Sequence, residues 1–133
     1  GGALRPRRRL GRARPKALAE LGWPWRTATP DDDFVDDPAS PLYNRWATVP
    51  SGQAPAFTSA EHLVDYELGL VVEHNAPEPL AGAGSAIFLH PWASPDTTTA
   101  GCTAIERDAL LTLLCWLDPS ARPLLLQLPG ELL

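Results

Sequence analysis

The segment that decides how this chain is interpreted reads Gly84-Ser85-Ala86-Ile87-Phe88-Leu89-His90. Its residues are apolar at both odd and even positions, which predicts a buried, central strand that ends in an imidazole. A tight turn is predicted shortly afterwards by Thr99-Ala100-Gly101-Cys102, whose small residues present a thiol. A histidine at a strand end facing a cysteine in such a turn is the minimum equipment for thiolate nucleophilic catalysis, because the imidazole can take the thiol proton.

The flanking sequence predicts a mainly β domain with one long helix after the cysteine. Upstream, every second residue from Tyr66 to Val72 is apolar, the period of a strand with one buried face. Downstream, Thr103 and Glu106 have the spacing of a capping box, so we expect a helix from there to about Trp116, stopped by Asp118-Pro119. A last strand is expected from Leu124 to Leu128.

Cys102 and Gly101 have the features of a catalytic turn. The expected helix starts one to three residues after Cys102, and the partial positive charge of a helix N-terminus favours the thiolate. Gly101 permits a sharp turn that leaves the amide N–H groups of Gly101 and Cys102 free to face a developing oxyanion. Pro91 follows the histidine and offers only a carbonyl, which suffices to fix the tautomer of His90.

Three segments carry a resemblance to a known family: Val71-Val72-Glu73-His74-Asn75, then Gly82-Ala83-Gly84-Ser85-Ala86-Ile87-Phe88-Leu89-His90, then Thr99-Ala100-Gly101-Cys102-Thr103-Ala104-Ile105. Together they resemble the L,D-transpeptidase catalytic domain (YkuD or ErfK type), which acts on bacterial peptidoglycan. The stretch from Asp36 to Arg45 is similar to the shorter, actinobacterial-type members, and the resemblance covers about residues 31–128.

The resemblance implies an L,D-transpeptidase-like β-sandwich or barrel with the active site at one edge. It implies that Cys102 is the nucleophile and His90 the base, with Gly101 in the catalytic turn. The residues expected to contact substrate are His74, Trp92, Thr99 and Ala100. No metal or other cofactor is implied.

The implied reaction is acyl transfer on peptidoglycan stem peptides. Cys102 would attack the amide that joins the L-centre of a diamino acid to its terminal D-residue and form a thioester. An amine of a neighbouring stem would resolve the thioester into a cross-link, whereas water would make the protein an L,D-carboxypeptidase or amidase. The family also suggests acylation by carbapenems and a location in the cell envelope.

One departure from the family pattern keeps a non-catalytic alternative open. Family members usually carry a second histidine before the Gly-Cys pair, and here that position is Ala100. The strands that precede the acidic segment in the family are also not recognisable in residues 1–30. A catalytically impaired domain that binds the cell wall, or serves as a scaffold, is therefore a second hypothesis.

Charge is unevenly distributed along the 133-residue chain. Seven of its eleven basic residues lie in the first sixteen positions, whereas residues 17–133 carry four basic and sixteen acidic groups, a net charge of −12. An acidic catalytic region argues against nucleic acid as a partner. We expect residues 1–30 to be a basic, poorly ordered leader punctuated by Pro and Trp, or the start of an N-terminally truncated member, and residues 31–133 to be the catalytic domain.

The sequence contains no apolar run of about 18 residues, so we expect no transmembrane segment, and no signal peptide is recognisable. Cys115 lies in an apolar helical run, which favours one reactive and one buried thiol over a disulfide with Cys102. A zinc site is a third hypothesis, but its candidate ligands lack short ligand spacings: His62, His74, His90 and Cys102. The acidic run from Asp31 to Asp37 lacks the glycine and glutamate of an EF-hand, so we expect a solvated turn.

Overall fold

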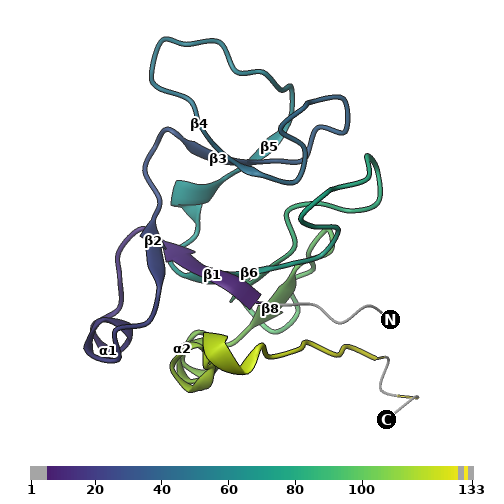
Figure 1. Cartoon of the computed structure of the whole chain (residues 1–133). Helices are drawn as coiled ribbons and strands as arrows, with labels where there is room; N and C mark the ends of the chain where they lie inside the picture. Colours follow the sequence, from purple (N-terminus) through teal and green to yellow (C-terminus); the bar gives the residue numbers. More distant parts are fainter. Residues whose placement is uncertain (1–5, 129–130, 132–133) are drawn as a thin grey trace.

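The computed structural model describes residues 6–128 and residue 131. Within this part, eight strands form two sheets, and two α-helices cover the larger sheet (Figure 1). The elements are β1 (Pro6–Gly11), α1 (Lys16–Glu20), β2 (Trp25–Thr27), β3 (Asp32–Val35), β4 (Trp46–Thr48), β5 (Ala60–His62), the 3₁₀ helix η1 (Leu63–Asp65), β6 (Gly69–Val72), β7 (Phe88–Pro91), β8 (Thr103–Ile105), α2 (Arg107–Trp116) and the 3₁₀ helix η2 (Pro119–Ala121). The prediction of a β-rich domain is confirmed.

The larger sheet has the order β2-β1-β6-β7-β8, so β7 is an interior strand, as its apolar sequence predicts. It begins at Phe88, however, and residues 84–87, which were expected to belong to it, precede the strand. It pairs antiparallel with β6, which places Leu70 opposite Leu89. Its other neighbour, β8, runs parallel to it, with Ala104 opposite His90. This parallel pairing brings the segment that follows Cys102 beside the strand that carries His90.

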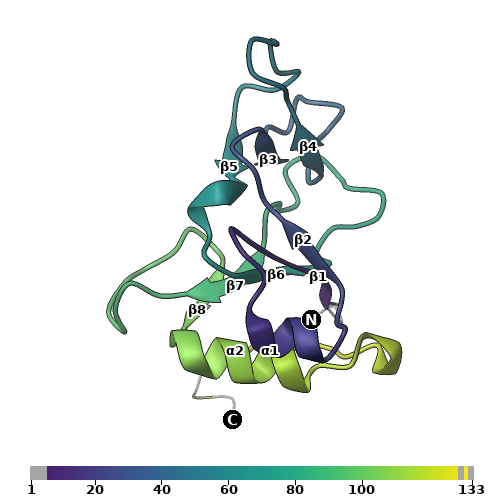
Figure 2. The same ribbon diagram turned by 90° about the vertical axis from the view of Figure 1, so that its left-hand side faces the viewer.

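The molecule is layered, with the smaller sheet β4-β3-β5 over one face of the larger sheet and both helices over the other (Figure 2). Phe88 and Leu89 are adjacent on β7 and point to opposite faces of the larger sheet, one toward the smaller sheet and the other toward the helices. Both faces of β7 are therefore buried, which explains why its odd and even positions are both apolar. The layer between the sheets contains Leu10, Ala28, Phe34, Leu63, Ala86 and Phe88. The layer beneath the helices contains Leu18, Leu68, Leu70, Val72, Leu89, Leu110, Leu114 and Leu117.

The expectation of a poorly ordered leader is wrong for residues 6–27, which form β1, α1 and β2. β1 lies between β2 and β6 in the larger sheet. Arg9 is 3% exposed, and its guanidinium donates to the carbonyls of Leu114 (3.0 Å) and Leu117 (2.5 Å). A basic residue is therefore buried because it caps the carbonyl end of α2, where the helix dipole favours a cation.

The predicted start of the long helix needs correction. Helix α2 begins at Arg107, and the carboxylate of Glu106 caps it by accepting from the N–H groups of Asp108 (3.0 Å) and Ala109 (2.8 Å). The residue expected to start a capping box, Thr103, lies instead in β8. The helix ends at Trp116, as predicted.

The predicted strand from Leu124 to Leu128 does not form. Leu125 makes an isolated bridge, whereas the side chains of Leu124 and Leu126 are exposed. The segment lies along the helical side of the larger sheet, where Leu125 packs against the apolar core. Over the residues that are described, no helix combines the length and the apolar character that crossing a membrane requires.

The acidic segment is an organised part of the smaller sheet and not a solvated turn. Asp32 is buried in β3 and accepts hydrogen bonds from Trp46 Nε1, from Thr48 Oγ1 and from both the N–H and the hydroxyl of Thr29. Burial alone would raise the pKa of Asp32, but these hydrogen bonds outweigh it and hold the pKa at about 2. The ionised carboxylate thus ties β3 to β4.

Candidate active site

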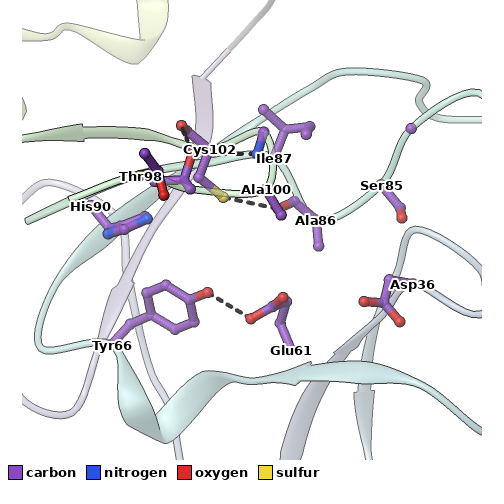
Figure 3. Close-up of a pocket in the computed structure, with 13 residues that line it drawn as sticks. Asp36, Glu61, Tyr66, Ser85, Ala86, Ile87, His90, Thr98, Ala100 and Cys102 are labelled. Atoms are coloured by element: carbon purple, nitrogen blue, oxygen red, sulfur yellow. Dashed lines mark hydrogen bonds between the residues drawn. The ribbon is translucent and has the colours of Figure 1, made fainter. Parts of the chain in front are cut away.

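A pocket of about 480 Å³ opens between the two sheets, with Cys102 and His90 on its wall (Figure 3). Three more of the residues predicted from the sequence to form the site line the same pocket: Thr99, Ala100 and Gly101. Strand pairing explains why Cys102 and His90 lie close together, because the register of β7 with β8 holds the turn before β8 near His90. The structure therefore brings the two candidate catalytic side chains into one cavity.

The thiol of Cys102 is half-buried against the layer between the sheets and is bonded to backbone groups. Sγ donates to the carbonyl of Ala86 at 3.3 Å and accepts from the N–H of Phe88 at 3.4 Å. The Thr99 hydroxyl donates to the Cys102 carbonyl at 2.6 Å, which fixes the turn on its other side. In this resting arrangement the S–H group of Cys102 points to the Ala86 carbonyl and not to His90.

The pKa of the Cys102 thiol is raised above its ordinary value. Burial is the main cause; the Phe88 N–H opposes it, and the Glu61 carboxylate adds to it by repelling a thiolate. The prediction that a helix N-terminus favours the thiolate is wrong, because strand β8 separates Cys102 from α2 and Glu106 already caps that helix. Formation of the thiolate therefore depends on a base.

His90 lines the same pocket and is held in the tautomer that a base requires. Its Nδ1 lies 2.8 Å from the Pro91 carbonyl, and since a carbonyl only accepts, Nδ1 carries the proton. In the neutral imidazole this leaves the lone pair on Nε2. The role predicted for the Pro91 carbonyl is confirmed. The ring also packs edge to face on Tyr66, with 5.4 Å between the ring centroids.

The wall opposite Cys102 consists of three residues that the sequence analysis did not assign to the site: Tyr66, Glu61 and Asp36 (Figure 3). The Tyr66 hydroxyl donates to Glu61 Oε2 at 2.8 Å. Burial first, and then the Glu61 carboxylate, raise the pKa of Tyr66, so the hydroxyl stays protonated. This wall presents hydrogen-bond acceptors and negative charge. Tyr66 was predicted only as a buried position of a strand. Asp36 lies in the acidic run and in the stretch that resembles the family, but neither gave it a role in the site, and no motif marks Glu61.

Gly101 forms the turn as expected, but its amide group is used differently. Its φ of +149° is a conformation that residues with a Cβ rarely adopt. Its N–H donates to the Thr99 hydroxyl at 3.3 Å instead of facing the pocket without a partner. The expectation of a free Gly101 N–H for an oxyanion therefore needs correction.

His74 and Trp92 lie outside this pocket. His74 Nε2 is 2.8 Å from the Ala83 carbonyl, and a Cβ on Gly84 would approach the same nitrogen to 2.6 Å. The imidazole thus packs against the loop before β7 and is hydrogen-bonded to it. Trp92 is half-buried, and its backbone N–H donates to the Ile105 carbonyl at 2.9 Å, which extends the pairing of β7 with β8.

Both cysteines are free thiols. Cys115 lies in α2 and packs against the helical core layer. Over the residues that the structure describes, no three His, Cys, Asp or Glu side chains gather in a way that could hold a metal ion.

No family model, curated protein or solved structure matches this chain. What bears on its function is therefore the geometry of the pocket, together with the three sequence motifs described above.

Proposed function

We propose that this domain is a cysteine acyltransferase of the L,D-transpeptidase type, with an L,D-transpeptidase-like β-sandwich fold, that acts on peptidoglycan stem peptides in the cell envelope. One observation carries the proposal: Cys102 and His90 line the same pocket, and the Pro91 carbonyl holds His90 Nδ1 so that Nε2 can accept a proton. The motif resemblance supplies the substrate class.

In the proposed acylation step, Sγ leaves the Ala86 carbonyl and transfers its proton to Nε2 of His90. The sulfur then attacks the amide carbonyl between the L-centre of the stem diamino acid and its terminal D-residue. The C–S bond forms, the C–N bond breaks, and the imidazolium returns the proton to the amine of the departing D-residue. The product is a thioester on Cys102.

The second step resolves the thioester. The side-chain amine of a neighbouring stem attacks the carbonyl, His90 takes the amine proton, and the thiol is regenerated as the cross-link forms. If water attacks instead, the same residues perform L,D-carboxypeptidase or amidase chemistry. The Glu61 and Asp36 carboxylates on the opposite wall are compatible with an entering amine.

A catalytically impaired cell-wall binding or scaffold domain is the second candidate function, and three observations favour it. The pKa of Cys102 is raised, and its thiol is bonded to Ala86 and not to His90. Ala100 also stands where the family usually has a histidine.

The two functions are separated by incubating the protein with a carbapenem and recording its intact mass. An enzyme gains the mass of one carbapenem molecule, keeps this adduct when Cys115 is replaced by Ala, and loses it in Cys102→Ala. Replacement of His90 by Gln slows acylation by about 10²- to 10⁴-fold, the usual contribution of a general base.

An unmodified wild-type protein that still binds purified peptidoglycan supports the scaffold and contradicts the enzyme. An adduct that persists in Cys102→Ala contradicts the assignment of the nucleophile. With muropeptide substrates, release of the terminal D-residue with a new cross-link indicates transpeptidation, whereas its release alone indicates the carboxypeptidase.

A further inference from the structure

Asn44 joins the smaller sheet to the loop that leads into β7. It lies in the turn between β3 and β4, with a left-handed φ of 56°, and its backbone N–H donates to the Val35 carbonyl at 2.8 Å. Its side-chain Nδ2 donates to the carbonyls of His74 and Asn75, both at 2.8 Å, and its Oδ1 accepts from the Ala86 N–H at 3.1 Å. One amide therefore binds both ends of the segment from residue 74 to residue 86.

The same segment is held internally by a different asparagine. Asn75 Nδ2 donates to the carbonyls of Leu80 (2.8 Å) and Gly84 (3.0 Å), and Asn75 Oδ1 accepts from the Leu80 N–H at 2.9 Å. Asn75 also has a left-handed φ, of 52°. Its side chain closes the middle of the loop without bonding Ala86, which makes the two asparagines a natural pair for comparison.

Ala86 is the residue through which Asn44 reaches the active-site pocket. It is buried, at 6% exposure, and adopts a φ of 52°, a conformation that is unfavourable for a residue with a Cβ. The hydrogen bond from its N–H to Asn44 holds this conformation, and its carbonyl accepts the Cys102 thiol proton. The other hydrogen bond to the sulfur comes from Phe88, which β6 holds independently through the register with Val71.

We propose that Asn44 is a positioning residue for the Cys102 thiol: by holding the backbone conformation of Ala86 through its N–H, it keeps the Ala86 carbonyl in place to accept from the S–H group and holds the thiol in its protonated resting state. A hydrogen bond to the neutral form of an acid opposes ionisation, so the contact restrains the reactivity of the sulfur until it is broken. The role of this restraint in catalysis rests on the proposed function. Its effect on how fast the thiol reacts can be measured whether or not the protein is an enzyme.

The charged and titratable groups that face Cys102 come from other elements and do not depend on Asn44. They are Asp36 after β3, Glu61 on β5, Tyr66 after η1 and His90 on β7. None of these side chains is bonded to the Asn44 amide in the described part of the chain. A change at Asn44 therefore tests the backbone contact from Ala86 separately from the electrostatics of the pocket.

The experiment measures alkylation of Cys102 by iodoacetamide as a function of pH, in a Cys115→Ala parent so that a single thiol reacts. Asn44→Gly removes the side-chain amide while tolerating the left-handed backbone. We expect Cys102 to react about two- to tenfold faster at pH 7, the range that corresponds to one lost neutral hydrogen bond. The pH profile should also move to lower pH, and the Ala86 amide should exchange faster with solvent by NMR.

Asn75→Gly is the matched control: it loosens the same loop at a second left-handed asparagine, and the alkylation profile should stay that of the parent. The proposal is overturned if Asn44→Gly keeps the parent profile although its Ala86 amide has lost protection, or if Asn75→Gly accelerates alkylation equally. Should Asn44→Gly not fold, rapid exchange of the Ala86 amide in the parent would overturn the proposal, and slow exchange would support it. A protein without a carbapenem adduct would refute the proposed function and leave this result standing.

Discussion

The sulfur of Cys102 experiences opposing influences from two neighbours. The Phe88 N–H donates to it and stabilises a thiolate, whereas the Glu61 carboxylate repels one across the pocket. Together with burial, which is the largest cause, the repulsion places the pKa of Cys102 above its ordinary value. Because the protonated thiol is unreactive, the rate of alkylation at neutral pH reports directly on this balance.

We expect Glu61→Gln to lower the pKa of Cys102, because the substitution removes the negative charge and leaves an oxygen that can still accept from Tyr66. The thiolate fraction at neutral pH rises as a result, so iodoacetamide reacts faster and the pH profile shifts to lower pH. Glu20→Gln, at an exposed site on α1, should leave the profile unchanged. A profile that is the same in Glu61→Gln and wild type would mean that Glu61 does not act on the sulfur.

Local features of the pocket could be predicted, and distant ones could not. The Pro91 carbonyl is one residue from His90, so its contact with Nδ1 follows from the dipeptide itself. Asn44, by contrast, meets Ala86 across 42 positions of the chain. Asn44 lies in the Asp36–Arg45 stretch that resembles the family, but the resemblance gives it no role. Its partners are backbone groups that only the folded arrangement of the two sheets brings within reach.

At the level of single elements, helix α2 depends on a residue from the start of the chain. The Leu114 and Leu117 carbonyls near its C-terminus have no partner further along the helix, and the buried guanidinium of Arg9 supplies one. The indole of Trp23 adds a hydrogen bond to the Cys115 carbonyl at 3.1 Å. The end of α2 is thus completed by β1 and by the segment after α1.

We expect Arg9→Met to lower the free energy of unfolding by about 2–4 kcal/mol, because it leaves two carbonyls buried without donors. Arg9→Lys should fall between the wild type and Arg9→Met, since an ammonium cannot reproduce the fork of the guanidinium. Urea denaturation measures both values. Arg12→Met, at an exposed position close by, should stay within about 0.5 kcal/mol of wild type, and an equally small effect at Arg9 would contradict the capping role.

The elements that were predicted well are those with a local signal. Apolar residues at both odd and even positions indicated β7, and Asp118-Pro119 indicated the end of α2. The start of α2 was misplaced because Thr103 and Glu106 have the spacing of a capping box. In the structure Thr103 lies in β8, where it pairs with Leu89 on β7, and cannot begin the helix. β1 was missed because a run of arginines resembles a solvated leader, and only the presence of α2 makes burial of Arg9 favourable.

At the scale of the whole molecule, the first strand holds the larger sheet together. β1 pairs in parallel with β2 on one side and antiparallel with β6 on the other. Leu10 contributes to the layer between the sheets, and Leu18 on α1 contributes to the layer beneath the helices. A boundary at residue 30, as expected from composition, would therefore divide both core layers.

Deletion of residues 1–30 tests this interpretation. β6 would lose a strand partner, α2 would lose Arg9, and the two core layers would lose fully buried leucines, Leu10 and Leu18. We expect residues 31–133 alone to unfold without a cooperative urea transition, to give poorly dispersed NMR spectra and to expose Cys102 to alkylation at the rate of an unfolded peptide. A truncated chain with a sharp transition and a wild-type alkylation profile would instead mean that the leader is dispensable and that the pocket is built by the later strands alone.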